Sequence, residues 1–333
     1  MKTTRRVVRY ILPDNNNSTQ LQDGEEYTID YIESRMLPTH MRQKKLQNTK
    51  SFTCNCDRCT NPIDTTRCIP CCNRDKNCDG VHYVTSSPSV VGLNNCTICN
   101  DPCDNTITIE ELQEQEDYIQ NECLELNALY DSEEANHPDM QRRLLQLQPP
   151  HKYHYLASDP IFIVQANYYG SNDNNNDKEK QIELLQNRVN CYEQILGDGE
   201  DVYPNVLTAV AYEMLADATS SSASAGDDTA TTTTTTALRI YQKALRIYEI
   251  THGFNDKKHF SSCMDKVFQL QREQKLRNSA DDSSSSSLSS LTNCALCNTP
   301  ATKKCSRCNQ VVYCTKQHQR AHWLPVHKHD CCK

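Results

Sequence analysis

The sequence predicts an α+β protein that is mostly α-helical and is built from several small units. Apolar residues recur at helical spacing through much of residues 105–275. Most of the 20 cysteines fall into two segments that carry few large apolar residues. Alternating, strand-like residues are confined to a short stretch near the N-terminus. Because only 37% of the residues are hydrophobic, we expect small packed units joined by unfolded connectors.

Residues 1–50 are expected to supply the β part of the fold. Tyr27, Ile29 and Tyr31 alternate with polar residues, which predicts a strand with one buried face. The basic residues 38–50 that follow predict a helix.

Residues 51–104 form the first cysteine-rich segment and carry ten cysteines. Asn, Asp and Pro dominate between them, so we expect no hydrophobic core here and a metal ion as the organiser of the fold. Two cysteine pairs have the spacing of zinc ribbons, which predicts a further zinc site. The pairs are Cys68 with Cys71 and Cys96 with Cys99.

Residues 105–275 are expected to form an α-helical array similar to tetratricopeptide (TPR) repeats, although no strict repeat period is visible. Thr108 and Glu111 have the spacing of a capping box, which predicts a helix start. Apolar residues step by three and four along residues 182–196 and 237–252. Three isolated cysteines in the helical stretches are expected to be small buried side chains. They are Cys123, Cys191 and Cys263.

Two low-complexity tracts are expected to be unfolded, because they offer too little apolar area to offset the entropy of ordering. Residues 218–237 are nearly all Thr, Ser and Ala, and would be an insertion in the helical unit. Residues 276–291 are rich in Ser, and would be a linker that tethers the last unit, residues 292–333.

Composition limits the location and the partners of the chain. We find neither a signal peptide nor a run of about 18 apolar residues, so we expect the cytoplasm or the nucleus and no membrane. In these reducing compartments, clustered thiols bind metal rather than form disulfides. The net charge of -8 argues against nucleic-acid binding by the whole chain.

The second cysteine-rich segment places eight Cys and His side chains in four close pairs. Thiolate and imidazole donors in this number suit two tetrahedral zinc sites. A segment of roughly 40 residues with so little core cannot fold on apolar burial alone, whereas structural zinc contributes on the order of 10–16 kcal/mol per site. The pairs are Cys294 with Cys297, Cys305 with Cys308, Cys314 with His318, and His327 with Cys331.

This spacing resembles that of the MYND zinc finger, and the stretches Ser306–Arg307, Val312–Tyr313 and Gln319–Trp323 between the ligands are also similar to it. The chain departs from the family at His318, where Cys is more common, and by one extra residue before His327. The resemblance implies two interleaved zinc sites. Zinc 1 would take Cys294, Cys297, Cys314 and His318, and zinc 2 would take Cys305, Cys308, His327 and Cys331.

The MYND resemblance also implies binding rather than catalysis, because four protein ligands leave zinc no open position. MYND fingers bind short proline-containing peptides, and the corresponding surface here would be Ser306, Gln319 and Trp323. Packing of Trp323 over the zinc sites is the alternative role for this residue. The finger is also basic, so nucleic-acid binding is a secondary expectation. Cys332 and two histidines expected to be exposed, His322 and His329, could replace a neighbouring ligand.

Residues 22–59 resemble the end of a SET domain and its post-SET cysteines, as in the SMYD family of lysine methyltransferases. The similar stretches are Gly24–Tyr31, Met41–Leu46 and Cys54–Cys59. The resemblance implies that Tyr31 would be the active-site tyrosine. It also implies a post-SET zinc held by Cys54, Cys56 and Cys59, with a fourth ligand from an Asn-His-Ser-Cys segment that does not precede residue 24. Four other cysteines could supply that ligand, namely Cys68, Cys71, Cys72 and Cys78.

Two functions are consistent with the sequence. The first is a zinc-binding protein that interacts with other proteins through its MYND finger and keeps an inactive SET-like remnant. The alternative is an S-adenosylmethionine-dependent protein-lysine methyltransferase whose N-terminal SET segment is missing from the sequence. Because the methyl-donor pocket of that family needs Gly-x-Gly and Asn-His-Ser-Cys segments, we expect no methyl transfer by the chain as given.

Overall fold

The computed structural model describes most of the chain beyond residue 35. The described residues are 36–71, 78–87, 90–102, 108–130, 138–171, 175–196, 205–222, 229–252, 258–281, 293–297, 300–323, 327–328 and 331. The strand predicted at residues 27–31 therefore lies outside them. None of the described helices is both long enough and apolar enough to cross a membrane.

A small antiparallel sheet forms the N-terminal cysteine-rich unit. Its strands β1 (Ile63–Pro70), β2 (Val81–Ser87) and β3 (Val90–Leu93) pair in chain order. Two helices precede the sheet: α1 (Thr39–Lys50), where the basic residues predicted a helix, and the short α2 (Asp57–Thr60).

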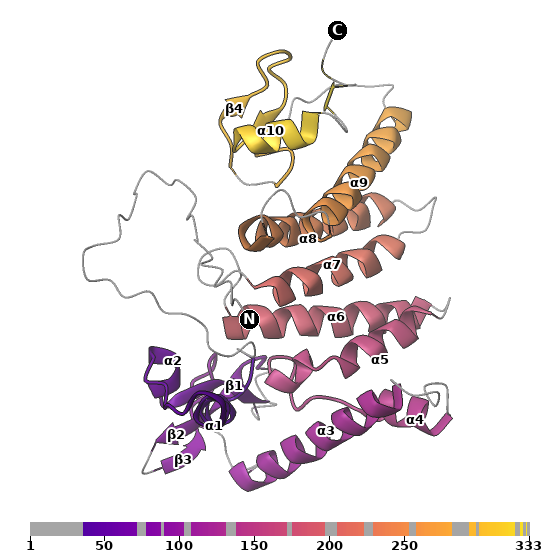
Figure 1. Cartoon of the computed structure of the whole chain (residues 1–333). Coiled ribbons are helices and arrows are strands. Elements are labelled where there is room, and N and C mark those ends of the chain that lie inside the picture. The colour runs from indigo at the N-terminus through magenta and orange to yellow at the C-terminus, as the bar shows by residue number, and fades with distance from the viewer. Residues whose placement is uncertain are drawn as a thin grey trace, which may run out of the picture.

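Stacked helices make up most of the remaining fold (Figure 1). They are α3 (Ile109–Tyr130), α4 (Pro138–Gln146), α5 (Ile161–Gly170), α6 (Asn175–Leu196), α7 (Val206–Ser221), α8 (Thr229–His252) and α9 (Phe260–Asp281), with the 3-10 helix η2 (Tyr155–Ser158) before α5. From α5 to α9 each helix packs on the next, and their apolar side chains share one core. The mostly helical α+β class is confirmed.

Local signals at the helices are also confirmed. The Thr108 amide donates to Glu111 Oε2 at 2.7 Å, and the Glu111 amide donates to Thr108 Oγ1 at 3.1 Å, which is the predicted capping box at the start of α3. The three isolated cysteines are buried in the helical core, each no more than 1% exposed. They are Cys123, Cys191 and Cys263.

The expectation that residues 51–104 lack a hydrophobic core is wrong. On one face of the sheet, Ile69 and Val84 are buried against Leu112 of α3. Apolar residues on the opposite face are buried as well, and there Tyr83 accepts a hydrogen bond from Gln194 of α6 at 2.7 Å. Because the helical unit packs on the sheet, a few apolar strand residues suffice for a core.

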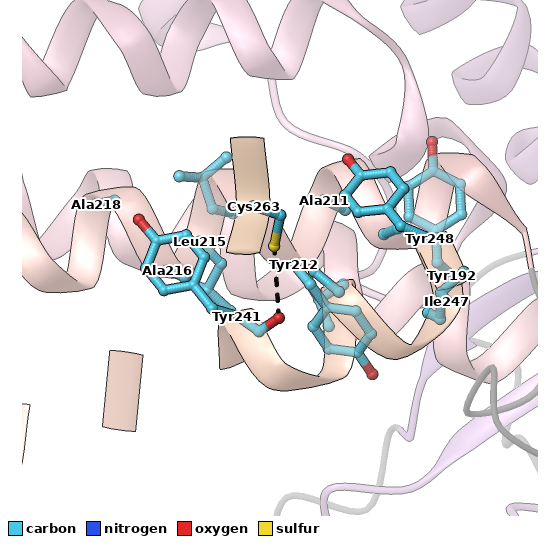
Figure 2. Close-up of a cluster of buried hydrophobic side chains, with 14 of the residues drawn as sticks. Tyr192, Ala211, Tyr212, Leu215, Ala216, Ala218, Tyr241, Ile247, Tyr248 and Cys263 are labelled. Carbon is cyan, nitrogen blue, oxygen red and sulfur yellow. Dashed lines mark hydrogen bonds between the residues drawn. The ribbon is translucent and has the colours of Figure 1, made fainter. Parts of the chain in front are cut away.

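The expectation that residues 218–237 are unfolded is also wrong for the described part of this tract. α7 continues to Ser221, and α8 begins at Thr229. Figure 2 shows Ala218 and Leu215 of α7 beside Tyr241 of α8. Ala216, Ala218 and Thr219 of α7 are no more than 8% exposed, so packing of the helices overrides the composition.

The linker predicted at residues 276–291 begins later than expected. α9 continues to Asp281, so residues 276–281 are helical. Residues 282–292 lie outside the described part of the chain.

Candidate metal centres

A short hairpin and a helix give the C-terminal finger its frame. β4 (Lys303–Lys304) pairs with β5 (Val312–Tyr313), and α10 (Lys316–His322) follows. The Thr315 side chain caps α10 by accepting from the His318 amide at 3.1 Å. Asn309 takes the left-handed conformation, with φ 54°, in the turn after Cys308. These elements bring residues that are distant in sequence to two common centres.

The first centre of the finger brings together Cys294, Cys297, Cys314 and His318, the four residues assigned to zinc 1 by the resemblance. The His318 Nδ1 atom lies 3.1 Å from the Cys314 sulfur and 3.4 Å from the Cys294 sulfur. The Cys297 and Cys314 sulfurs are 3.5 Å apart. His318 therefore turns Nδ1 toward the thiols.

The second centre brings together Cys305, Cys308, His327 and Cys331. Its Cys305 and Cys331 sulfurs are 3.8 Å apart, and His327 Nε2 lies 3.4 Å from the Cys308 sulfur. Each centre thus takes one pair of ligands from before β5 and one pair from after it. This is the interleaved arrangement.

These distances fit zinc. A tetrahedral zinc ion with ordinary bond lengths separates two sulfurs by about 3.8 Å and a sulfur from a nitrogen by about 3.6 Å. A disulfide would need sulfurs about 2.0 Å apart, and the cysteines of both centres are free. Four donors complete the coordination shell, so an ion here would be structural.

The hydrogen bonding of one finger cysteine also favours metal binding. Burial raises the pKa of Cys305, but backbone amides of Cys308 and Arg307, with the side chains of His327 and Cys331, outweigh burial and lower this pKa to about 6. This shift favours the thiolate of Cys305, which is the form that binds zinc.

A third centre lies at one edge of the N-terminal sheet and consists of Cys71, Cys78, Cys96 and Cys99. The Cys71 and Cys99 sulfurs, and likewise the Cys78 and Cys96 sulfurs, are 3.6 Å apart, which again fits tetrahedral zinc. Burial raises the pKa of Cys96, but the Ile98 and Cys99 amides and neighbouring thiols lower it to about 6.

Gly80 is needed for this third centre. A Cβ atom at Gly80 would lie 2.3 Å from the Cys96 sulfur, so any side chain would displace the thiol. The Gly80 amide also donates to the Cys78 sulfur at 3.4 Å. The backbone at the start of β2 thus forms one wall of the centre.

The third centre differs from the prediction at one residue. Cys78 takes the place expected for Cys68, whose side chain is fully buried on the Tyr83 face of the sheet. Burial, helped by Glu116, raises the pKa of Cys68 to about 12, and its sulfur lies 3.8 Å from His151 Nδ1. The Cys68 sulfur is not among the four donors of this centre.

A fourth group consists of Cys54, Cys56 and Cys59, the three residues assigned to a post-SET zinc. Gln43 of α1 holds Cys54 by two hydrogen bonds to its backbone, at 2.6 and 2.9 Å. Arg42 Nη2 approaches the Cys59 sulfur at 3.8 Å. Among the described residues, no fourth metal donor joins this group. Tyr31 lies outside the described residues.

The three finger side chains that are expected to bind a peptide differ in their exposure to solvent. Ser306 is exposed, while Gln319 and Trp323 are half-buried. The Trp323 ring stands edge-on to the ring of the ligand His327, with centroids 5.5 Å apart. Trp323 therefore packs near a residue of the second centre and also keeps part of its surface exposed.

The expectation that His322 is exposed is wrong. Its ring is 6% exposed, pairs through Nδ1 with the Tyr313 hydroxyl at 2.8 Å, and stacks on His327 at 5.8 Å. It lies in the core of the finger. Its fellow candidates His329 and Cys332 are outside the described residues.

Comparisons with known proteins identify the finger. The MYND finger family matches residues 294–331. A stretch of 58 residues is 36% identical to ubiquitin carboxyl-terminal hydrolase 17 of Arabidopsis thaliana, and covers 17% of this chain and 8% of that protein. This chain therefore spans a small fraction of that relative's length. Neither match supports the likeness of the rest of the chain to SMYD proteins.

Proposed function

We propose that this chain acts in protein–protein interaction and recognises its partner through the MYND finger at residues 294–331. The observation that carries the proposal is that each finger centre has four protein donors within 4.8 Å of one another. Zinc held in this way has no position left for a substrate or an activated water. The metal then serves to shape a surface. The chain binds zinc at more than one site, because further cysteine groups lie outside the finger.

We assign the ligands of three closed zinc sites to the three groups with four donors. The donors are Cys294, Cys297, Cys314 and His318; Cys305, Cys308, His327 and Cys331; and Cys71, Cys78, Cys96 and Cys99. Cys54, Cys56 and Cys59 would hold a further ion with a donor from elsewhere.

The recognition surface we propose consists of Ser306, Gln319 and Trp323, and its ligand is a proline-containing segment of another protein. Trp323 packs edge-on against the His327 ring and remains partly exposed. A rigid aromatic ring loses little entropy on binding and offers a flat face to a proline ring. Gln319, one turn earlier on α10, can hydrogen-bond to the peptide backbone.

Replacing Trp323 with Phe should weaken binding of such a peptide about tenfold, because the smaller ring buries less area. The full chain would be titrated into a fluorescent proline-containing peptide taken from a binding screen, with anisotropy as the signal. The expected dissociation constant is in the micromolar range, since a short groove buries little area after association costs are met.

Lys316→Ala is the matched control, since Lys316 is exposed on the same helix as Gln319. It should bind as the wild type does. Both variants must keep the wild-type zinc content. Equal affinity of Trp323→Phe and wild type for every selected peptide would rule out this surface.

The alternative function, protein-lysine methyl transfer, rests on the resemblance of residues 22–59 to the SMYD family. Tyr31, the residue on which that chemistry would depend, lies outside the described residues. Neither the MYND family match nor the similarity to the ubiquitin hydrolase supports the SMYD resemblance, and for this reason we favour the interaction function.

A further inference from the structure

The finger does not stand apart from the helical array in the described structure. Leu296, Cys305 and Tyr313 of the finger belong to the same buried core as the helices α8 and α9. Gln271 of α9 donates to the Ala295 carbonyl at 2.7 Å, and the Phe268 ring lies 5.6 Å from the His322 ring. The finger is therefore docked on the array, in addition to being tethered by the linker that the sequence predicts.

One contact reaches from the array to a metal donor. Glu249 of α8 places Oε2 2.7 Å from His318 Nε2, across 69 residues of sequence. The His318 side chain is 1% exposed and that of Glu249 is 15% exposed, so water competes little for this bond. Arg246, one turn earlier on α8, lies 3.9 Å from the same carboxylate oxygen.

The two nitrogens of His318 have separate partners. Nδ1 faces the Cys294 and Cys314 sulfurs at 3.4 and 3.1 Å, so it is the nitrogen that would bind zinc. Nε2 then carries the proton and donates it in a hydrogen bond to Glu249. Carboxylates that accept this second N–H hold the imidazole in one tautomer and one orientation, and they make it a better ligand.

We propose that Glu249 is a positioning residue for the first zinc site of the finger, so that the helical array completes a site whose four ligands all belong to the finger. His318 makes this connection possible. A cysteine at this position would offer zinc one sulfur and would have no second N–H for α8 to hold. The proposal does not depend on peptide binding by the finger.

The test is zinc release from the full chain to a competing chelator, followed by absorbance. Glu249→Ala should accelerate release of one zinc ion by roughly tenfold or more, the usual effect of removing such a partner. Glu249→Gln keeps an acceptor oxygen and the side-chain volume, so it should release zinc at an intermediate rate and carries the test if Glu249→Ala folds poorly. Glu273→Ala removes a carboxylate of α9 that pairs with Gln269, and should leave the release rates unchanged.

A double-mutant cycle separates this role from a general effect on α8. In a His318→Cys chain the zinc ligand is kept but its second N–H is gone, so Glu249→Ala should no longer change zinc release. The ring ¹H–¹⁵N spectrum gives a second readout: the His318 Nε2–H signal should persist in wild type and shift or exchange away in Glu249→Ala. Unchanged zinc release in Glu249→Ala would overturn the proposal, as would the same acceleration in the His318→Cys background.

Discussion

Replacing Cys305 with Ala is expected to unfold the MYND finger and to leave the helical array folded. Cys305 is 1% exposed and is one of four donors of the second finger centre. Structural zinc contributes on the order of 10–16 kcal/mol per site, as much as the whole stability of an ordinary domain. The finger has too small a core to fold after losing one ion.

Hydrogen exchange followed by mass spectrometry measures this directly. Amides of β5 and α10 should lose protection in Cys305→Ala, while those of α5 to α7 keep it. Cys263→Ala is the matched control, because Cys263 is a buried thiol of α9 outside all the cysteine groups of the described residues. It should cost no more than a few kcal/mol and leave the finger protected. Protection of β5 and α10 unchanged in Cys305→Ala would contradict the assignment of this ligand.

Glu116→Ala is expected to destabilise the chain by about 3–5 kcal/mol, because it leaves a buried charge unpaired. Arg67 of β1 donates from Nε and Nη2 to the two Glu116 oxygens at 2.8 and 2.7 Å. His154 Nε2 lies 2.8 Å from Glu116 Oε1. These three side chains are between 0% and 8% exposed and join the sheet, α3 and the segment before α5.

Urea unfolding at neutral pH with zinc present measures this loss. Asp139→Ala is the control, since Asp139 pairs with Arg142 on the surface of α4 and exposed pairs contribute well under 1 kcal/mol. A loss in Glu116→Ala no larger than in Asp139→Ala would show that the buried cluster does not hold the sheet to the array.

Acid should weaken the buried cluster of Arg67, Glu116 and His154 that joins the sheet to the helical array. Burial lowers the pKa of His154, although Glu116 opposes this. The contribution of His154 to stability therefore falls as pH drops below the ordinary value of about 6.5. Burial raises the pKa of Glu116, but His154 and Arg67 outweigh burial and hold this pKa low. The contribution of Glu116 to the free energy of unfolding is therefore lost only at lower pH, below about 4.5.

The pH dependence can be assigned with a variant. His154→Gln should reduce the slope of the unfolding free energy against pH between pH 6.5 and 5. The reduction should be at most that of one proton taken up on unfolding, which is about 1.4 kcal/mol per pH unit. The slope is obtained from urea titrations at several pH values. An identical slope in wild type and His154→Gln would contradict this account.

The sequence prediction was most detailed at the finger, because it relied on the local spacing of the ligand pairs. Its ligands come in pairs three or four residues apart, on turns and one helix, so each pair is formed locally. The contact between Glu249 and His318 could not be foreseen in this way. It joins residues 69 apart in sequence, and it depends on how the finger docks on α8.

Strand geometry explains why Cys68 was the wrong choice in the third centre. Side chains three positions apart on a strand point to opposite faces, and β1 continues through Pro70. Cys68 therefore turns into the core, while Cys71 follows the end of the strand. Pairing of β1 with β2 brings Cys78 close instead, a relation that spacing alone does not reveal.

Composition gave a wrong prediction for the Thr- and Ser-rich tract, residues 218–237, for a related reason. Low apolar content predicts disorder when a segment is considered alone. In the fold, Thr234 and Ala237 of α8 are 2% and 0% exposed, so the neighbouring helices supply the apolar surface that the tract lacks. Tertiary packing overrides local propensity here.

Native mass spectrometry of the full chain, purified without added metal, tests the central claim that closed zinc sites organise this protein. We expect at least three zinc ions per chain, one for each group of four donors. Cys78→Ser should remove one ion, and Cys68→Ser should remove none. Fewer than three ions in the wild type, or loss of zinc from Cys68→Ser but not from Cys78→Ser, would contradict it.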